Sequence, residues 1–242
     1  MDCVEAARWL RDATASLETG VAWTYHPLQY AWGVHEAYLR RYGGPKKALL
    51  VGMNPGPWGM GQTGVPFGDP VLAGDWLGLR GGTVEAPATT HPKRPVLGWG
   101  SKRREMSGQR LWGYFRDRFG TPERALADLL VVNHCPLLLF NEDGQNITPD
   151  KLRREPRERM LEVCDEGLRR MVEATGAGTL VGVGRYAEER CRAVAEGTGL
   201  RTASIPHPSP ASPIANADGG RVWREAVDRS LAALGIAPEA TA

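Results

Sequence analysis

The stretch Ala-Leu-Leu-Val-Gly-Met-Asn-Pro-Gly-Pro, residues 48–57, gives the clearest indication of the fold. Its first four residues form a short apolar run that is followed by the turn signal Asn54-Pro55-Gly56-Pro57. Such a run is typical of a strand buried on both faces. Three similar runs occur later in the chain, at residues 129–132, 179–183 and 202–205. The sequence therefore predicts four buried strands.

Amphipathic or capped segments between and after these runs predict helices. They cover residues 2–18, 28–42, 107–119, 148–175, 185–197 and 221–234. Strands that alternate with helices indicate an α/β fold, with a four-stranded parallel sheet flanked by helices on both faces. Glycine and proline are concentrated between residues 52 and 100, where we expect a long, tightly turned loop region. The length of 242 residues fits a single domain spanning residues 1–242.

Unusual polar residues follow three of the predicted strands. Asn54 follows the first, Asn133 ends the second, and His207 lies between two prolines after the fourth. The carboxyl ends of parallel strands share one edge of the sheet, where open α/β sheets bind ligands. Taken alone, Asn54 could be a turn former, Asn133 a strand cap and His207 a loop histidine. Their common placement at one edge favours a functional site.

Several other sites lack support in the sequence. Gly182-Val183-Gly184 has no third glycine for a dinucleotide fingerprint, and neither a phosphate-binding P-loop nor a nucleophile elbow is present. The four cysteines are scattered without a Cys-x-x-Cys pair, which indicates reduced thiols and no metal site. No apolar run approaches the ~18 residues that cross a bilayer. We therefore expect no metal, no membrane association and no signal peptide.

The charge distribution is uneven although the net charge is only +2. Residues 80–124 carry 10 basic and 4 acidic side chains, a local charge of +6. Five of these basic residues form a cluster interleaved with tryptophans: Lys93, Arg94, Lys102, Arg103 and Arg104. Such a cluster could bind a phosphate backbone or could be a solvated loop.

At this point the motifs resemble a known family. The segment from Gly52 to Asp69 is similar to the first motif of the single-strand-selective monofunctional uracil-DNA glycosylases, and His207–Pro210 is similar to their second motif. Three shorter segments also fit: His91–Gly98, Asn133–Leu137 and Val181–Arg185. The resemblance covers roughly residues 22–237 and implies the four-stranded parallel sheet of the uracil-DNA glycosylase superfamily.

The resemblance also implies roles for individual residues. Asn54 would orient the attacking water, and His207 would stabilise the charge that develops on the departing base. Asn133 would read the base, Phe67 would stack on it, and Gly56 and Met60 would line the pocket near its C5 atom. The implied substrate is uracil, with 5-hydroxymethyluracil also tolerated, in single- or double-stranded DNA. No cofactor and no lyase activity are implied.

One position departs from the family pattern. The loop that follows His207 would enter the duplex with Pro208, Ser209 and Pro210, but Ala211 stands where animal relatives have arginine. Two alternatives remain: a glycosylase for other deaminated bases such as xanthine or hypoxanthine, and a catalytically idle DNA-binding module. We expect a monomer, located in the cytoplasm of a bacterium or in the nucleus of a eukaryote.

Overall fold

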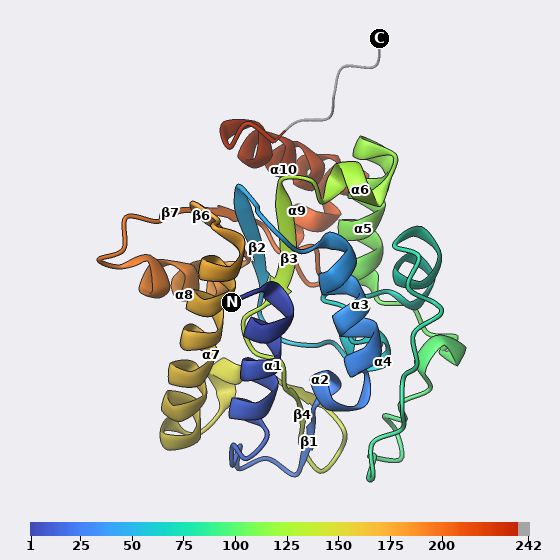
Figure 1. Ribbon diagram of the computed structural model, residues 1–242. Coiled ribbons are helices and arrows are strands. Elements are labelled where there is room, and N and C mark those ends of the chain that lie inside the picture. Colours follow the sequence, from blue (N-terminus) through green and yellow to red (C-terminus); the bar gives the residue numbers. More distant parts are fainter. Residues whose placement is uncertain (237–242) are drawn as a thin grey trace.

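The computed structural model describes residues 1–236, and its centre is a parallel sheet of four strands (Figure 1). The strands run in the order β3 (Leu129–Asn133), β2 (Ala48–Gly52), β6 (Thr179–Val183) and β7 (Arg201–Ile205). Every neighbouring pair is parallel, with Ala48 opposite both Leu129 and Thr179. The predicted α/β fold class is therefore confirmed, and each predicted strand agrees with the observed one to within one residue. The prediction that all four strands are buried is wrong for β7, which lies at the edge of the sheet and buries only Ile205.

Helices cover both faces of this sheet. The chain moves from β2 outward to β3 and then returns across β2 to β6, so right-handed connections place the intervening helices on opposite faces. Helix α5 (Met106–Phe119) lies on one face beside α10 (Arg221–Ala233), where the rings of Tyr114 and Trp223 meet edge to face at 5.8 Å. Helices α7 (Arg154–Thr175) and α8 (Arg185–Ala195) cover the other face (Figure 1).

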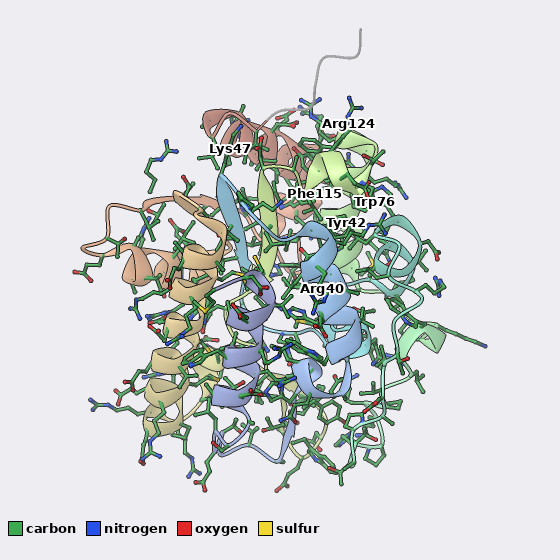
Figure 2. All side chains as sticks on the ribbon, in the orientation of Figure 1. Arg40, Tyr42, Lys47, Trp76, Phe115 and Arg124 are labelled. Carbon is green, nitrogen blue, oxygen red and sulfur yellow. The ribbon has the colours of Figure 1, made fainter. Side chains whose placement is uncertain are left out.

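The free edge of β3 is covered by the N-terminal helices. Helix α1 (Cys3–Thr14) packs on α7 and on α3 (Trp32–Tyr42), and α3 reaches β3 through Tyr38. The Tyr38 hydroxyl on α3 donates a hydrogen bond to the Val131 carbonyl at 3.0 Å, which occupies a backbone group of the edge strand. Phe115 and Tyr42 are buried, whereas Arg40 and Arg124 are exposed; all four are labelled in Figure 2.

Three predicted helices differ from the observed ones. The helix predicted over residues 2–18 ends at Thr14. Residues 28–42 form two helices, α2 (Pro27–Tyr30) and α3, because Ala31 has the non-helical backbone angles φ −119° and ψ 27°. The helix predicted from residue 148 begins only at Arg154. Thr148 opens a single 3₁₀ turn, Pro149–Lys151, which ends because Leu152 is extended with ψ 155°.

A second, three-stranded sheet was not predicted. It is antiparallel, in the order β1 (Trp23–Tyr25), β4 (Leu138–Phe140) and β5 (Asn146–Ile147). Residues 52–100 are mostly irregular, as predicted, with one short helix, α4 (Met60–Thr63), a wide turn at Leu72–Trp76 and a 3₁₀ turn at Gly98–Gly100. The remaining short elements are α6 (Pro122–Ala125), α9 (Pro213–Asn216) and a 3₁₀ turn at Ala217–Gly220.

All four cysteines are buried free thiols. Within residues 1–236, no helix is long and apolar enough to cross a membrane.

Candidate active site

A pocket of about 210 Å³ opens at the carboxyl edge of the parallel sheet. It lies at the switch point of the strand order, where α/β sheets commonly bind ligands. The structure brings together here all six residues predicted to act on or bind the base: Asn54, Gly56, Met60, Phe67, Asn133 and His207. The other lining residues were not predicted: Met53, Pro55, Pro57, Glu105, Ser107 and Asn146. The pocket is smaller than the ~300–1,000 Å³ typical of drug-sized ligands, which suits a single nucleobase.

The Asn54 amide is held from one side only. Its Nδ2 group donates to the Leu137 carbonyl at 3.2 Å and to the Pro55 carbonyl at 3.4 Å. No hydrogen bond from residues 1–236 reaches Oδ1, so this oxygen is available as an acceptor at the pocket. The arrangement can orient a water molecule without removing its proton, since an amide is not a strong base.

His207 is a neutral imidazole whose tautomer is set by the backbone. Its Nδ1 atom accepts a hydrogen bond from the Ser209 N–H at 3.1 Å, so the ring proton resides on Nε2. Burial lowers the pKa of His207 below its ordinary value, which also favours the neutral form. The side chain therefore presents a neutral N–H donor at the pocket.

Gly184, at the end of β6, makes room for this histidine. Its φ of +80° is in a region that favours glycine, and a Cβ there would lie 3.0 Å from the Cβ of His207. The Gly182–Gly184 segment thus serves close packing at the strand end.

Phe67 is held against His207 in an uncommon backbone conformation. The two rings are 5.9 Å apart at 43°, and φ of Phe67 is +52°, which is rare for a bulky residue. Gly108 on α5 lies against this turn, since a Cβ there would approach the Phe67 carbonyl to 2.0 Å. Such strained residues are concentrated at functional sites.

Asp69 fixes the turn that follows Phe67. Its buried carboxylate accepts hydrogen bonds from both Nε and Nη2 of Arg104, at 2.7 and 2.6 Å, and from the Leu72 N–H. Burial raises the pKa of Asp69, but the hydrogen bonds from Arg104 and the backbone outweigh it and keep that pKa below its usual value. The guanidinium of Arg104, a predicted DNA contact, is thus engaged in supporting the pocket wall.

The Asn133 amide has a defined orientation. Its Nδ2 group donates to the Met60 sulfur at 3.3 Å. Its Oδ1 atom lies on the opposite side, since a Cβ on Gly52 would be 2.4 Å from this oxygen and 2.6 Å from the Phe67 ring. The amide thus places an acceptor beside Phe67 and a donor beside Met60, both of which line the pocket, an arrangement that can read two adjacent groups on a base edge.

Glu105 brings a carboxyl group into the same pocket. It caps the N-terminus of α5, where its Oε1 atom accepts the Ser107 N–H at 3.2 Å. Burial raises the pKa of Glu105 above its ordinary value. Sequence analysis missed this residue because it lies in a charged loop, far along the chain from the motif it contacts.

Two arginines of the basic cluster lie beside Trp58, the residue after the pocket-lining Pro57. The guanidinium groups of Arg103 and Arg94 lie 4.5 and 5.5 Å from the Trp58 ring centre, and Arg94 also donates to the Gly144 carbonyl at 2.6 Å. Lys93 and Lys102 are exposed, and no ion pair or hydrogen bond joins either ammonium group to residues 1–236. These two side chains are free to contact a phosphate.

The loop after His207 is fixed by two residues that sequence analysis did not identify. Arg110 on α5 donates to the Pro208 carbonyl at 3.0 Å and to Asn216 at 2.8 Å, and Asn216 in turn donates to the Pro210 carbonyl at 2.6 Å. Pro208 is buried, Ser209 is half-buried, and Pro210 and Ala211 are exposed. Ile214, at the start of α9, exposes 44% of its surface beside this loop.

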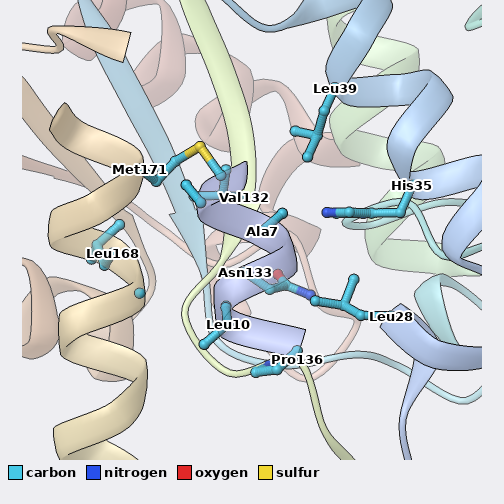
Figure 3. Close-up of a pocket in the computed structure, with 12 residues that line it drawn as sticks. Ala7, Leu10, Leu28, His35, Leu39, Val132, Asn133, Pro136, Leu168 and Met171 are labelled. Atoms are coloured by element: carbon cyan, nitrogen blue, oxygen red, sulfur yellow. The ribbon is translucent and has the colours of Figure 1, made fainter. Parts of the chain in front are cut away.

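A second cavity lies on the other side of Asn133 (Figure 3). It has a volume of about 30 Å³, close to the share of one liquid water, so it cannot hold a base. Its lining is mostly aliphatic and comes from α1, α3, α7 and the end of β3: Ala7, Leu10, Leu39, Val132, Leu168 and Met171. Among residues 1–236, no group of three His, Cys, Asp or Glu side chains is arranged to hold a metal ion.

Comparisons with known proteins agree with this geometry. The model of the uracil DNA glycosylase superfamily matches residues 41–228, most of the chain. The chain belongs to this superfamily. Single-strand selective monofunctional uracil DNA glycosylases from Bos taurus and Rattus norvegicus are 46% and 45% identical over 217 residues. The matched region covers 88% of this chain and 78% and 76% of those relatives.

A solved structure supports the fold of this superfamily member. The crystal structure of wild-type Pedobacter heparinus SMUG2 matches with a TM-score of 0.64 at 18% identity, covering 95% of this chain and 97% of that one. At this identity the likeness concerns the fold alone. The family relationship that the sequence motifs predicted is thus confirmed by the family model and the mammalian relatives.

Proposed function

We propose that this protein is a base-excision repair enzyme that hydrolyses the N-glycosidic bond of uracil in DNA, taking the base out of the stack to reach it. The observation that carries the proposal is the convergence of Asn54, Asn133 and His207 on one base-sized pocket. An enzyme that acts on a base in DNA needs such a pocket, because the bond is inaccessible within the helix. The presence of all three polar groups argues against an idle binding module.

The leaving group and the nucleophile are served by different residues. As the bond between N1 of uracil and C1′ of the sugar breaks, negative charge develops on the base. The Nε2–H of His207 donates to the uracil O2 atom and stabilises this charge. Asn54 Oδ1 orients a water molecule whose oxygen bonds to C1′, and the water proton is ultimately carried by the released uracil.

Asn133 selects uracil by its hydrogen-bonding pattern. Its Oδ1 atom accepts from N3–H and its Nδ2 group donates to O4. Cytosine has an acceptor at N3 and a donor at its 4-position, so both contacts would be mismatched at a cost of about 1–3 kcal/mol each. Phe67 stacks on the base, which contributes ~1–3 kcal/mol. Hypoxanthine and xanthine carry the same pair, an acceptor at O6 beside a donor at N1–H, so these contacts reject cytosine and do not separate uracil from the deaminated purines.

DNA is held by the rim of the pocket. We assign phosphate contacts to Lys93, Lys102 and Arg103, together with Arg94 beside Trp58. Arg104 supports the Phe67 turn through Asp69. The segment Pro208–Ala211 and the neighbouring Ile214 enter the space left by the flipped base.

The enzyme leaves an intact abasic site. A lyase would need an amine nucleophile, and none of the described residues that line the pocket is a lysine. Lys46 and Lys47 precede β2 at the opposite edge of the sheet, where Figure 2 shows Lys47, and Lys47 pairs with Asp128 at 2.8 Å. Incubation with uracil-containing oligonucleotides should release free uracil without strand cleavage. Borohydride trapping of a protein–DNA adduct would contradict the assignment.

The site of action follows from the substrate. We propose that the protein acts as a monomer wherever genomic DNA is held. The relatives compared are mammalian, so they favour the nucleus over the bacterial cytoplasm.

A further inference from the structure

The contacts of Asn133 define which wall of the pocket faces which edge of a bound uracil. Its Oδ1 atom lies toward Gly52 and Phe67, the side on which the His207 ring lies against that of Phe67. Its Nδ2 group lies toward Met60. If Oδ1 accepts from N3–H, then O2 lies toward His207, in agreement with the role of that residue. O4 then lies toward Met60, and the C5 edge comes next.

The wall beyond Met60 contains one ionisable group. Gly59 and Gly56 precede Met60, and both lie against the Glu105 carboxyl group. A Cβ on Gly56 would be 2.7 Å from Glu105 Oε2, and a Cβ on Gly59 would be 3.1 Å from the same oxygen. Since the α5 cap uses Oε1, Oε2 is the carboxylate oxygen on the glycine side of the pocket.

We propose that Glu105 is a specificity-determining residue that reads the substituent at C5 of the base. This inference rests on the proposed uracil-DNA glycosylase function. A carboxylate accepts hydrogen bonds only, so it favours a C5 substituent that donates, such as hydroxymethyl. It disfavours a formyl group, which can only accept. Gly56 and Gly59 leave the space through which the carboxylate and the substituent meet.

The test compares two C5 substituents in wild type and Glu105→Gln. Single-turnover excision of 5-formyluracil, 5-hydroxymethyluracil and uracil is measured in single-stranded oligonucleotides at pH 8.5, well above the ordinary pKa of glutamate. Glutamine keeps an oxygen for the α5 cap and adds an N–H donor. The formyl-to-hydroxymethyl rate ratio should rise about tenfold over wild type, because one mismatched contact becomes matched. The intrinsic reactivity of each base cancels in this double ratio.

Two further variants make the result decisive. Glu123→Gln removes the same charge at α6, outside the pocket, and should leave the ratio unchanged. Glu105→Asp retains a good helix cap but withdraws the carboxylate, so it should lower the hydroxymethyl-to-uracil ratio severalfold. A purely structural role for Glu105 would slow all three substrates equally. The proposal would be overturned if the formyl-to-hydroxymethyl ratio of Glu105→Gln and the hydroxymethyl-to-uracil ratio of Glu105→Asp both stay within twofold of the wild-type ratios. Failure of wild type to release uracil would overturn the proposed function itself.

Discussion

His207 shows how a single side chain is prepared for its role by its neighbours. The Ser209 N–H occupies Nδ1, and burial lowers the pKa of the imidazole. Protonation of His207 at Nδ1 would place an N–H of the imidazole against the Ser209 N–H and displace the imidazole ring. The uracil-excision rate should therefore stay constant from pH 8 down to the ordinary histidine pKa of about 6.5, and should fall only below it.

A single-turnover pH profile tests this expectation. Because the pKa of Glu105 is raised, the profile of Glu105→Gln serves as the control, and it should keep the same acidic limb. A midpoint at or above pH 7 would show that His207 is not held in the neutral state.

The sequence was sufficient to predict some of these side chains and not others. Asn54, Asn133 and His207 could be placed at one site because each lies at the carboxyl end of a predicted strand, and parallel strands end at a common edge. Glu105 and Arg110 carried no such signal. They reach the pocket and the Pro208 loop only because α5 packs across the sheet, which is a tertiary relationship without local periodicity.

Among the elements, the turn from β6 into α8 controls the position of His207. Gly184→Ala should cost about 1–3 kcal/mol of stability because its backbone conformation suits only glycine. It should also slow uracil excision by about 10- to 100-fold, because the added Cβ displaces His207.

Gly176→Ala is the matched control for that substitution. Gly176 ends α7 with φ +64°, and a Cβ there would meet nothing within 4 Å. The Gly176→Ala variant should lose about 1–2 kcal/mol of stability and keep the wild-type rate of uracil excision. Thermal unfolding and single-turnover rates measure the two effects separately, and equal rates in both variants would mean that Gly184 does not position the histidine.

The loop between β7 and α9 provides the second prediction at this level. Unstacking a base costs a few kcal/mol in a duplex and little in a single strand. Ala211→Arg should therefore raise the excision rate on double-stranded substrate more than on single-stranded substrate. Ile214→Ala should lower the excision rate on double-stranded substrate more than on single-stranded substrate. Parallel effects on both substrates in both variants would exclude this loop as the wedge.

Some helices and strands could be predicted from the sequence, and others could not. The strands β2, β3 and β6 and the helix α5 were found because burial imposes continuous apolar runs and helical spacing, whereas β7 buries only Ile205. The strands β1, β4 and β5 have only two or three residues each, too few for a period of two to be recognised. The break at Ala31 carries neither glycine nor proline, so nothing in its local sequence marks it.

Over the entire chain, the net charge of +2 conceals a basic segment, residues 80–124, whose local charge is +6. The double variant Lys93→Ala/Lys102→Ala should reduce the salt dependence of single-stranded DNA binding by a slope of about 1.4, since each phosphate contact contributes ~0.7. Lys47→Ala, at the opposite edge of the sheet, should leave the slope unchanged. Fluorescence anisotropy over a salt series measures both, and identical slopes in wild type and double variant would remove these lysines from the DNA interface.

The central claim is that Asn54 and His207 perform glycosidic hydrolysis in the pocket at the sheet edge. Its most direct test is the single-turnover rate of uracil release by wild type, Asn54→Ala and His207→Ala, each checked for folding by circular dichroism. Removing one preorganised polar group at a developing charge costs ~10²–10³-fold in rate. The account predicts uracil release by wild type and a loss of at least ~10²-fold in each folded variant. Near-wild-type release by either folded variant would contradict it.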